Sequence, residues 1–186
     1  MIKSNTAQQH QQVIAFCKSI FEKKNKDYDT SWRVLRVSSF TDQILIKARR
    51  IRNITEKGNQ RIGDDINSEL TGIINYSLMA LIQLQLEGNP QVSIPYGELA
   101  KLYDLVAKEV ADLMMQKNYD YEEVWRDMRV NSMVDIILMK LLRIKHIEDN
   151  HGQTCVSEGV KANYQDIVNY AIFCLILRGL VDHPKE

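Results

Sequence analysis

The sequence predicts an all-α protein built from two tandem copies of one helical motif. Long segments carry apolar residues at helical spacing, and none alternates with the period of two that a half-buried strand needs. Proline is scarce, with 3 residues in a chain of 186. When Lys117 is aligned with Lys24, more than half of the positions as far as Ile54 and Ile147 are identical. A duplication of this kind indicates two similar helical units.

The expected helices divide evenly about a break in the middle of the chain. They cover residues 6–25, 39–56, 62–86, 96–117, 132–148 and 156–178. The break lies between Pro90 and Pro95, and Gly58, Gly63 and Gly152 end helical segments elsewhere. We therefore expect one all-α domain over residues 1–186, a six-helix bundle with repeat one at about 6–86 and repeat two at about 96–178.

Composition and charge exclude several classes of protein. Basic and acidic residues number 24 each, so the formal net charge is zero, which argues against a large nucleic-acid footprint or an anionic membrane as partner. The N-terminus is polar and Gln-rich, unlike a signal peptide. The most apolar stretches, 136–142 and 167–177, are shorter than the roughly 20 residues that cross a bilayer. We expect a cytoplasmic protein with no membrane partner.

The cysteines and histidines do not form a ligand pattern. Cys17, Cys155 and Cys174 are widely spaced, without the spacing of a zinc site, and each is interpreted as structural. Cys155 lies near the predicted start of the last helix, where a thiol can be activated.

The duplicated residues are largely polar, and this distinguishes the repeat from a simple packing repeat. A fused dimer that kept only its core would retain apolar positions and let polar identities drift. The shared set here is Lys24/Lys117, Asn25/Asn118, Asp27/Asp120, Tyr28/Tyr121, Trp32/Trp125, Arg33/Arg126, Arg36/Arg129, Asp42/Asp135, Lys47/Lys140, Arg50/Arg143 and, one inserted residue later, Asn75/Asn169.

One duplicated lysine lies inside an apolar helical stripe. Steps of four and three residues connect Phe40, Ile44, Lys47, Ile51 and Ile54, and repeat two has Lys140 at the same place. A buried, unpaired charge is costly, so each lysine must reach solvent or meet an anion. That anion is either a carboxylate of the bundle or a phosphate of a ligand. Arg50 and Arg143 follow three residues later and would help each lysine to hold a phosphate.

A second duplicated segment mixes aromatic and basic residues. In repeat one, Arg33 and Arg36 are interleaved with Tyr28 and Trp32. In repeat two, Arg126 and Arg129 accompany Tyr121 and Trp125 in the same way. Tyrosine and tryptophan can enclose a base, and arginine can bind phosphate. The alternative is that the tryptophans close the ends of the bundle while the arginines cap helix C-termini.

Acidic residues in the last helix of each repeat suggest a metal site. Asp65 and Glu69 share one face of the expected helix 62–86, and Glu158 and Asp166 share a face of the expected helix 156–178. Clustered carboxylates in a helical bundle bind Mg²⁺, usually together with substrate phosphates. Alternatively, Asp64 and Asp65 are acids placed in the first turn by the helix dipole.

Together these motifs resemble nucleotide-modification-associated domain 1. The resemblance lies in K-N-x-D-Y-x-x-x-W-R-x-x-R, then D-x-x-x-x-K-x-x-R-I, then N-Y on a last helix, and it covers most of residues 20–177 in two copies. The family is thought to be related to the MazG-like all-α nucleotide pyrophosphohydrolases. That relation implies a MazG-like bundle, Mg²⁺ held by acidic helix residues, cleavage of a nucleoside triphosphate to monophosphate and pyrophosphate, and assembly as a homodimer.

The motif of these relatives is divided between the two repeats. A Glu-x-x-Asp pair is expected before N-Y, but Gly72 follows Glu69 in repeat one and Asn163 precedes Asp166 in repeat two. The resemblance therefore implies either one composite metal site formed by Glu69 and Asp166 or a protein that binds a nucleotide without cleaving it. The Glu-x-x-Glu pair of the partner helix has no counterpart, and Asp42 and Asp135 are the nearest acids.

These observations lead to one hypothesis and one rival, beside a third interpretation in which the Trp/Arg segments bind RNA or modified nucleotides. In the hypothesis a nucleoside phosphate binds between the halves. Its phosphates would contact Lys47, Arg50, Lys140 and Arg143; Mg²⁺ and catalysis would use Glu69 and Asp166, with Asp65 and Glu158 as further ligands; and the base pocket would include Tyr28, Trp32, Arg36, Asn75, Tyr121, Trp125, Arg129 and Asn169. In the rival, a helical interaction or scaffold protein, the lysines and acids only neutralise each other.

Overall fold

A computed structural model of the chain describes residues 5–58 and 65–181. This part contains six α-helices, two short 3-10 helices and no strand. The elements are α1 (Thr6–Tyr28), η1 (Ser31–Val34), α2 (Val37–Lys57), α3 (Ile66–Gln85), α4 (Tyr96–Tyr121), η2 (Val124–Asp127), α5 (Val130–Asp149) and α6 (Val160–Leu177). The predicted all-α class and the two-repeat order are confirmed, because α4–η2–α5–α6 repeats α1–η1–α2–α3.

The helix ends follow local signals. The carboxylate of Asp65 accepts a hydrogen bond from the Ser68 amide at 2.7 Å, and it fixes the start of α3 one residue later. The end of α2 lies at Gly58, whose φ of +67° is the left-handed conformation that glycine adopts without strain. The helix α4 begins directly after Pro95. The sequence signals therefore located the central break and the end of α2.

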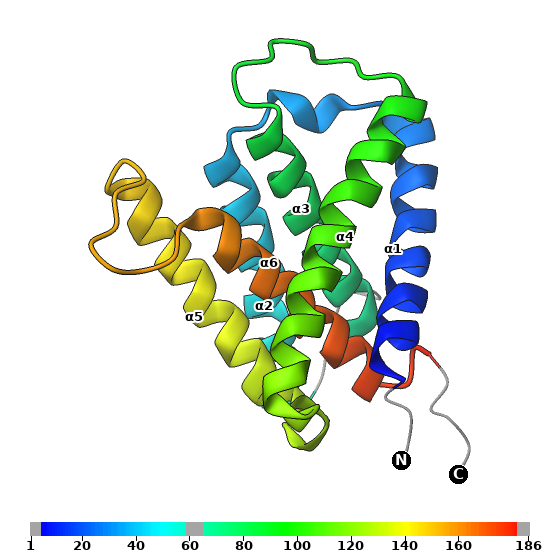
Figure 1. The fold of residues 1–186 in the computed structure, drawn as a ribbon, viewed down its shortest axis with the longest axis vertical. Helices are drawn as coiled ribbons and strands as arrows, with labels where there is room; N and C mark the ends of the chain where they lie inside the picture. Colours follow the sequence, from blue (N-terminus) through cyan, green and yellow to red (C-terminus); the bar gives the residue numbers. More distant parts are fainter. Residues whose placement is uncertain (1–4, 59–64, 182–186) are drawn as a thin grey trace.

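The six helices form three layers of two. The central pair, α3 and α6, packs together and also against all four other helices (Figure 1). The outer layers are α2 with α5 and α1 with α4. Both central helices are apolar on nearly every face, as Leu70, Ile73, Leu78, Ile167 and Ile172 show, and such helices are stable only when covered on all sides.

The helix pairings indicate a two-fold relation between the repeats. The contact of α1 with α6 has its counterpart in that of α4 with α3, and the contact of α2 with α3 has its counterpart in that of α5 with α6. Exchanging the repeats therefore leaves the set of contacts unchanged, as expected for a fused dimer. Within the described residues, no helix is both long and apolar enough to span a bilayer.

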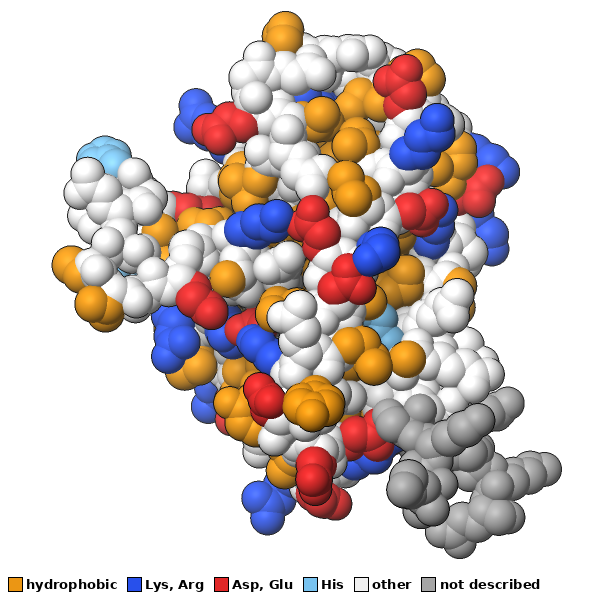
Figure 2. Space-filling model, viewed as in Figure 1, with side chains coloured by type: hydrophobic (Ala, Val, Ile, Leu, Met, Phe, Trp, Pro, Cys, Tyr) orange, Lys and Arg blue, Asp and Glu red, His pale blue; other side chains and the backbone are white. Residues whose placement is uncertain are grey.

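Charge is evenly distributed over the face seen in Figure 2. Lysine and arginine side chains alternate there with aspartate and glutamate, and neither sign forms a large patch. Because a nucleic-acid footprint needs many phosphate contacts from a basic surface, this face does not suit one.

Candidate functional site

Each repeat has a pocket between its three helices, and matched residues line both. The repeat-one pocket has a volume of about 640 Å³, and the repeat-two pocket about 440 Å³. The matched lining residues are Lys24/Lys117, Asn25/Asn118, Tyr28/Tyr121, Trp32/Trp125, Lys47/Lys140, Asn75/Asn169 and Tyr76/Tyr170. The repeat-one pocket also contains Asp65, Glu69 and Gly72, and the repeat-two pocket contains Asp166.

The stripe lysines are placed as predicted, and each meets a carboxylate at the edge of a pocket. Lys47 Nζ lies 3.3 Å from Glu69 Oε2, and the Arg50 guanidinium binds the other oxygen of that carboxylate. Lys140 Nζ lies 2.7 Å from Asp166 Oδ2. The side chains of Glu69 and Asp166 are only 6% and 8% exposed, so their charges require these cations. Both interpretations of the lysines therefore keep support. Each lysine has a carboxylate partner in the bundle, and each also borders a cavity that could hold a ligand phosphate.

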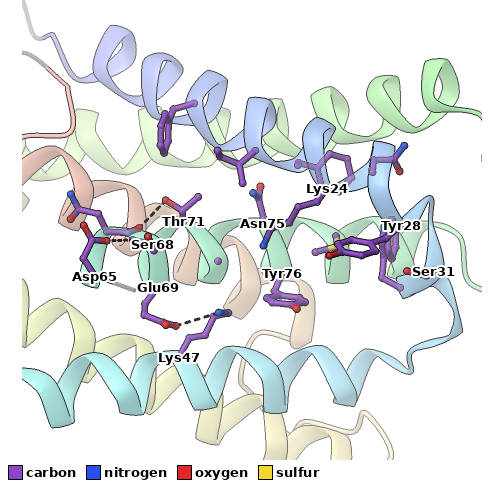
Figure 3. Close-up of a pocket in the computed structure, with 18 of the residues that line it drawn as sticks. Lys24, Tyr28, Ser31, Lys47, Asp65, Ser68, Glu69, Thr71, Asn75 and Tyr76 are labelled. Atoms are coloured by element: carbon purple, nitrogen blue, oxygen red, sulfur yellow. Dashed lines mark hydrogen bonds and ion pairs between the residues drawn. The ribbon is translucent and has the colours of Figure 1, made fainter. Parts of the chain in front are cut away.

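Lys24 and Lys117, which the site prediction omitted, enter these pockets from the first helix of each repeat. Lys117 Nζ lies 2.5 Å from Asp166 Oδ1. Lys24 forms no ion pair with any residue that the structure describes. In Figure 3, Lys24 on α1 and Lys47 on α2 reach toward α3 from opposite sides. The membership of this lysine in the duplicated set was the signal that could have identified it.

The asparagines of the first helices also line the pockets. Asn25 Oδ1 and Asn118 Nδ2 are buried polar atoms without a hydrogen-bond partner in the described chain. Buried amide groups are nearly always hydrogen-bonded, so Asn25 leaves an acceptor and Asn118 leaves a donor available to water or to a bound polar group. Like the lysines, this pair belongs to the duplicated set.

The aromatic residues form one wall of each pocket. Trp32 packs edge-on against Phe40 with ring centroids 6.0 Å apart, whereas Trp125 stacks on Phe173 at 4.3 Å. Tyr28 and Tyr121 are 67% and 66% exposed beside them. The tryptophans therefore serve the core and the pockets together, and the tyrosines remain accessible from solvent.

Several predicted site residues lie outside the pockets. Arg36 and Arg129 precede α2 and α5 at the surface, and Arg143 is exposed on α5. Arg143 cannot copy the role of Arg50, because repeat two has Asn163 where repeat one has Glu69. Glu158 is also exposed. The predicted face shared with Asp166 does not exist, since α6 begins only at Val160, after an extended Gly159.

The arginines next to the tryptophans hold loops and termini rather than helix C-termini. Arg33 donates to the carbonyl oxygens of Asn89 and Gln91 at 2.8 and 3.1 Å, and so fixes the link before α4. Arg126 donates to Gln9 and Thr6 of α1 and lies 4.3 Å from the Trp125 ring. The prediction that they cap helix ends is wrong, although their role is structural.

Asn75 and Asn169 serve the interface between repeats. The Asn75 amide donates to the Cys17 carbonyl at 3.0 Å, and its oxygen accepts from the Tyr103 hydroxyl at 2.9 Å. Asn169 donates to the Val110 carbonyl at 3.2 Å and accepts from His10 Nε2 at 3.0 Å. Both residues line a pocket, but their side-chain amides are already hydrogen-bonded to other residues of the protein.

The acids do not form the predicted composite metal site. Glu69 and Asp166 line different pockets and bind different cations. Asp65 caps α3, as the helix-start alternative proposed, and Asp64 lies outside the described residues. Among residues 5–58 and 65–181, no three His, Cys, Asp or Glu side chains gather into a metal-binding group. The described residues therefore supply no cluster of three protein donors for a resident Mg²⁺.

The cysteines are structural where they are buried. Burial raises the pKa of the Cys17 and Cys174 thiols to about 12, which keeps them protonated and unreactive. Cys155 is exposed and lies five residues before α6, so it is not at the start of the last helix where the sequence placed it.

Fold and site define this chain as a tandem-repeat helical protein with a lysine-containing pocket in each repeat. Its sequence matches a family model over residues 24–84 and again over 117–177, and the chain belongs to the nucleotide modification associated domain 1 family. The expected membership is thereby confirmed. A search of curated proteins and a search of solved structures each found no match. The relation to MazG-like enzymes stays a prediction.

Proposed function

We propose that this protein binds a nucleoside phosphate in the repeat-one pocket. The main support is the combination, on duplicated residues, of two lysine ammonium groups with accessible aromatic rings. Lysines suit phosphate oxygens, and aromatic rings suit a base. The volume of about 640 Å³ falls within the range of small-molecule sites. The description of the family, associated with nucleotide modification, agrees with this ligand class.

Within this proposal Lys24 and Lys47 contact the phosphate, and Tyr28 with Trp32 lines the base side. This arrangement replaces the predicted placement of the ligand between the halves. Arg50 supports Lys47 indirectly, because it shares the Glu69 carboxylate. Mg²⁺-dependent cleavage remains a second prediction. The acidic residues of this pocket support cleavage less well than binding, because Glu69 already pairs with two cations and Asp65 already caps α3.

Calorimetric titration with nucleoside mono- and triphosphates, with Mg²⁺ and with EDTA, tests the proposal. The protein should bind at least one nucleotide. Lys24→Ala should weaken binding about tenfold or more, since one charge-assisted hydrogen bond contributes about 1.5–3 kcal/mol. Lys23→Ala, an exposed neighbour outside the pocket, is the matched control and should bind normally.

The outcomes separate three functions. No heat with any nucleotide would refute binding and favour the interaction or scaffold protein with internal ion pairs. Release of pyrophosphate from a triphosphate, present only with Mg²⁺, would establish the enzyme. Binding without release would establish a nucleotide-binding protein that does not cleave its ligand.

A further inference from the structure

We infer that the repeat-two pocket carries its own anion, the carboxylate of Asp166, and that the acid group of the ligand takes the matching place in repeat one, beside Gly72. The identification of the ligand's acid group as a nucleotide phosphate rests on the proposed function. The anion site itself rests on a comparison of the two repeats within this chain.

In repeat two, the Asp166 carboxylate bridges two lysines from different helices. Oδ1 lies 2.5 Å from Lys117 of α4, and Oδ2 lies 2.7 Å from Lys140 of α5. Each oxygen has its own ammonium donor, which is the geometry that a bound phosphate would also use. The carboxylate is 8% exposed, so it occupies the interior of its pocket.

In repeat one, the same two lysines are present but the carboxylate is not. Lys24 and Lys47 correspond to Lys117 and Lys140, and Gly72 stands at the place of Asp166. The acid of α3 is Glu69, three residues earlier, which is about 4.5 Å along the helix axis. Because Glu69 binds Lys47 and Arg50, Lys24 is left without an ion pair among the described residues.

The absence of a side chain at Gly72 determines the path of Lys47. A Cβ atom at this position would lie 2.8 Å from Lys47 Cε and 2.9 Å from Cδ. The lysine therefore passes over Gly72 to reach Glu69, and its ammonium remains beside the position that a carboxylate fills in repeat two. Figure 3 shows Lys47 reaching from α2 toward α3, where its ammonium group pairs with Glu69. A ligand anion beside Gly72 would contact Lys47 and Lys24 together.

The second pocket is unsuited to the same ligand. A phosphate there would meet the negative charge of Asp166, whose two oxygens already pair with both lysines. We therefore expect one anion per chain, in repeat one. The duplication has thus left one pocket with an open anion position and one pocket in which a side chain of the protein fills that position.

Gly72→Asp is the direct test, because it copies repeat two into repeat one. The new carboxylate should attract Lys24 and Lys47 and abolish binding of inorganic pyrophosphate and of a nucleoside triphosphate. The helix tolerates the change, since the nearest atoms belong to the flexible end of Lys47. Gly97→Asp adds the same charge in α4, where nothing lies within 4 Å, and should leave binding unchanged.

Two further measurements do not depend on that variant. The unchanged protein should bind one pyrophosphate per chain, and Lys117→Ala should bind normally whereas Lys24→Ala loses affinity. Two ligands per chain, or full binding by Gly72→Asp, would overturn the inference and leave nucleotide binding intact. Pyrophosphate bound without any nucleotide would uphold the anion site and refute the proposed function. Binding of neither probe would overturn both.

Discussion

Lys47 and Lys140 occupy the same position in the two repeats. The carboxylates that they bind, however, differ by about one helical turn in the aligned last helices of those repeats. Asp166 lies opposite Lys140, whereas Lys47 must cross Gly72 to reach Glu69. The side chain of Lys140 is 10% exposed and that of Lys47 is 26% exposed. The pair in repeat two is therefore the more buried, and the fold depends on it more strongly.

Removal of the Asp166 carboxylate should destabilise the protein. Asp166→Ala leaves Lys140 as a buried charge without its partner, and losing one member of such a pair costs about 3 kcal/mol. Chemical denaturation at neutral pH measures this loss. Glu158→Ala, an exposed acid near the same helix, should change the unfolding free energy by less than about 0.5 kcal/mol. Equal stability of the two variants would contradict the structural role of the pair.

At the scale of the helices, the sequence predicted which helices exist and in what order better than it predicted the residues at which they begin and end. Apolar periodicity identified each of the six α-helices in the described residues because burial imposes it, and the Pro90–Pro95 break is seen as predicted. The two starts that differ most from the prediction, at Ile66 and Val160, depend on the caps Asp65 and Gly159. Such a cap depends on a single hydrogen bond or backbone angle, and the spacing of apolar residues carries no information about either.

The cap of α3 carries a testable contribution to stability. Asp65→Ala should lower the free energy of unfolding by about 1 kcal/mol at neutral pH, because the Ser68 amide loses its acceptor. The Ser68 backbone hydrogen bond lowers the pKa of Asp65, so the contribution is present above the unfolded pKa near 3.8 and is lost as pH falls below it. The deficit of the variant, measured by urea titration, should therefore shrink at pH 3.

Asp65→Asn is the control for this prediction. Asparagine caps helices nearly as well as aspartate and does not titrate, so its stability at neutral pH should be close to that of the unchanged protein. A loss as large as that of Asp65→Ala would show that the charge, and not the hydrogen bond, stabilises the start of α3.

For the whole molecule, the duplicated polar residues divide into two roles that one sequence could not separate. Lysines 24, 47, 117 and 140 line pockets, whereas Asp42 and Asp135 join the repeats. Asp42 pairs with Lys145 at 2.6 Å, and Asp135 pairs with Arg52 at 3.7 Å. Both roles preserve identical residues in the two repeats, because a two-fold interface requires the same contact residues on each side just as a pair of equivalent binding sites does. Separation of the acids into two pockets depends on the packing of α3 with α6, which spacing along the chain does not specify.

The contact of His10 with Asn169 should make this union of the repeats sensitive to pH. Burial lowers the pKa of His10, partly offset by its hydrogen bond to Asn169, so the folded protein holds the neutral imidazole. The unfolded chain, with a pKa near 6.5, binds a proton first as pH falls. Stability from this group is therefore complete above about pH 6.5 and declines below it, by at most about 1.4 kcal/mol per pH unit.

His10→Gln tests that dependence, because glutamine can still donate to Asn169 but does not titrate. Unfolding free energies measured between pH 7.5 and 5 should show a shallower decline for the variant than for the unchanged protein. His146→Gln, which changes an exposed histidine of α5, is the matched control and should keep the original slope. Parallel curves for His10→Gln and the unchanged protein would show that the imidazole is protonated without loss of the contact. The hydrogen bond between α1 and α6 would then hold the repeats together in either charge state.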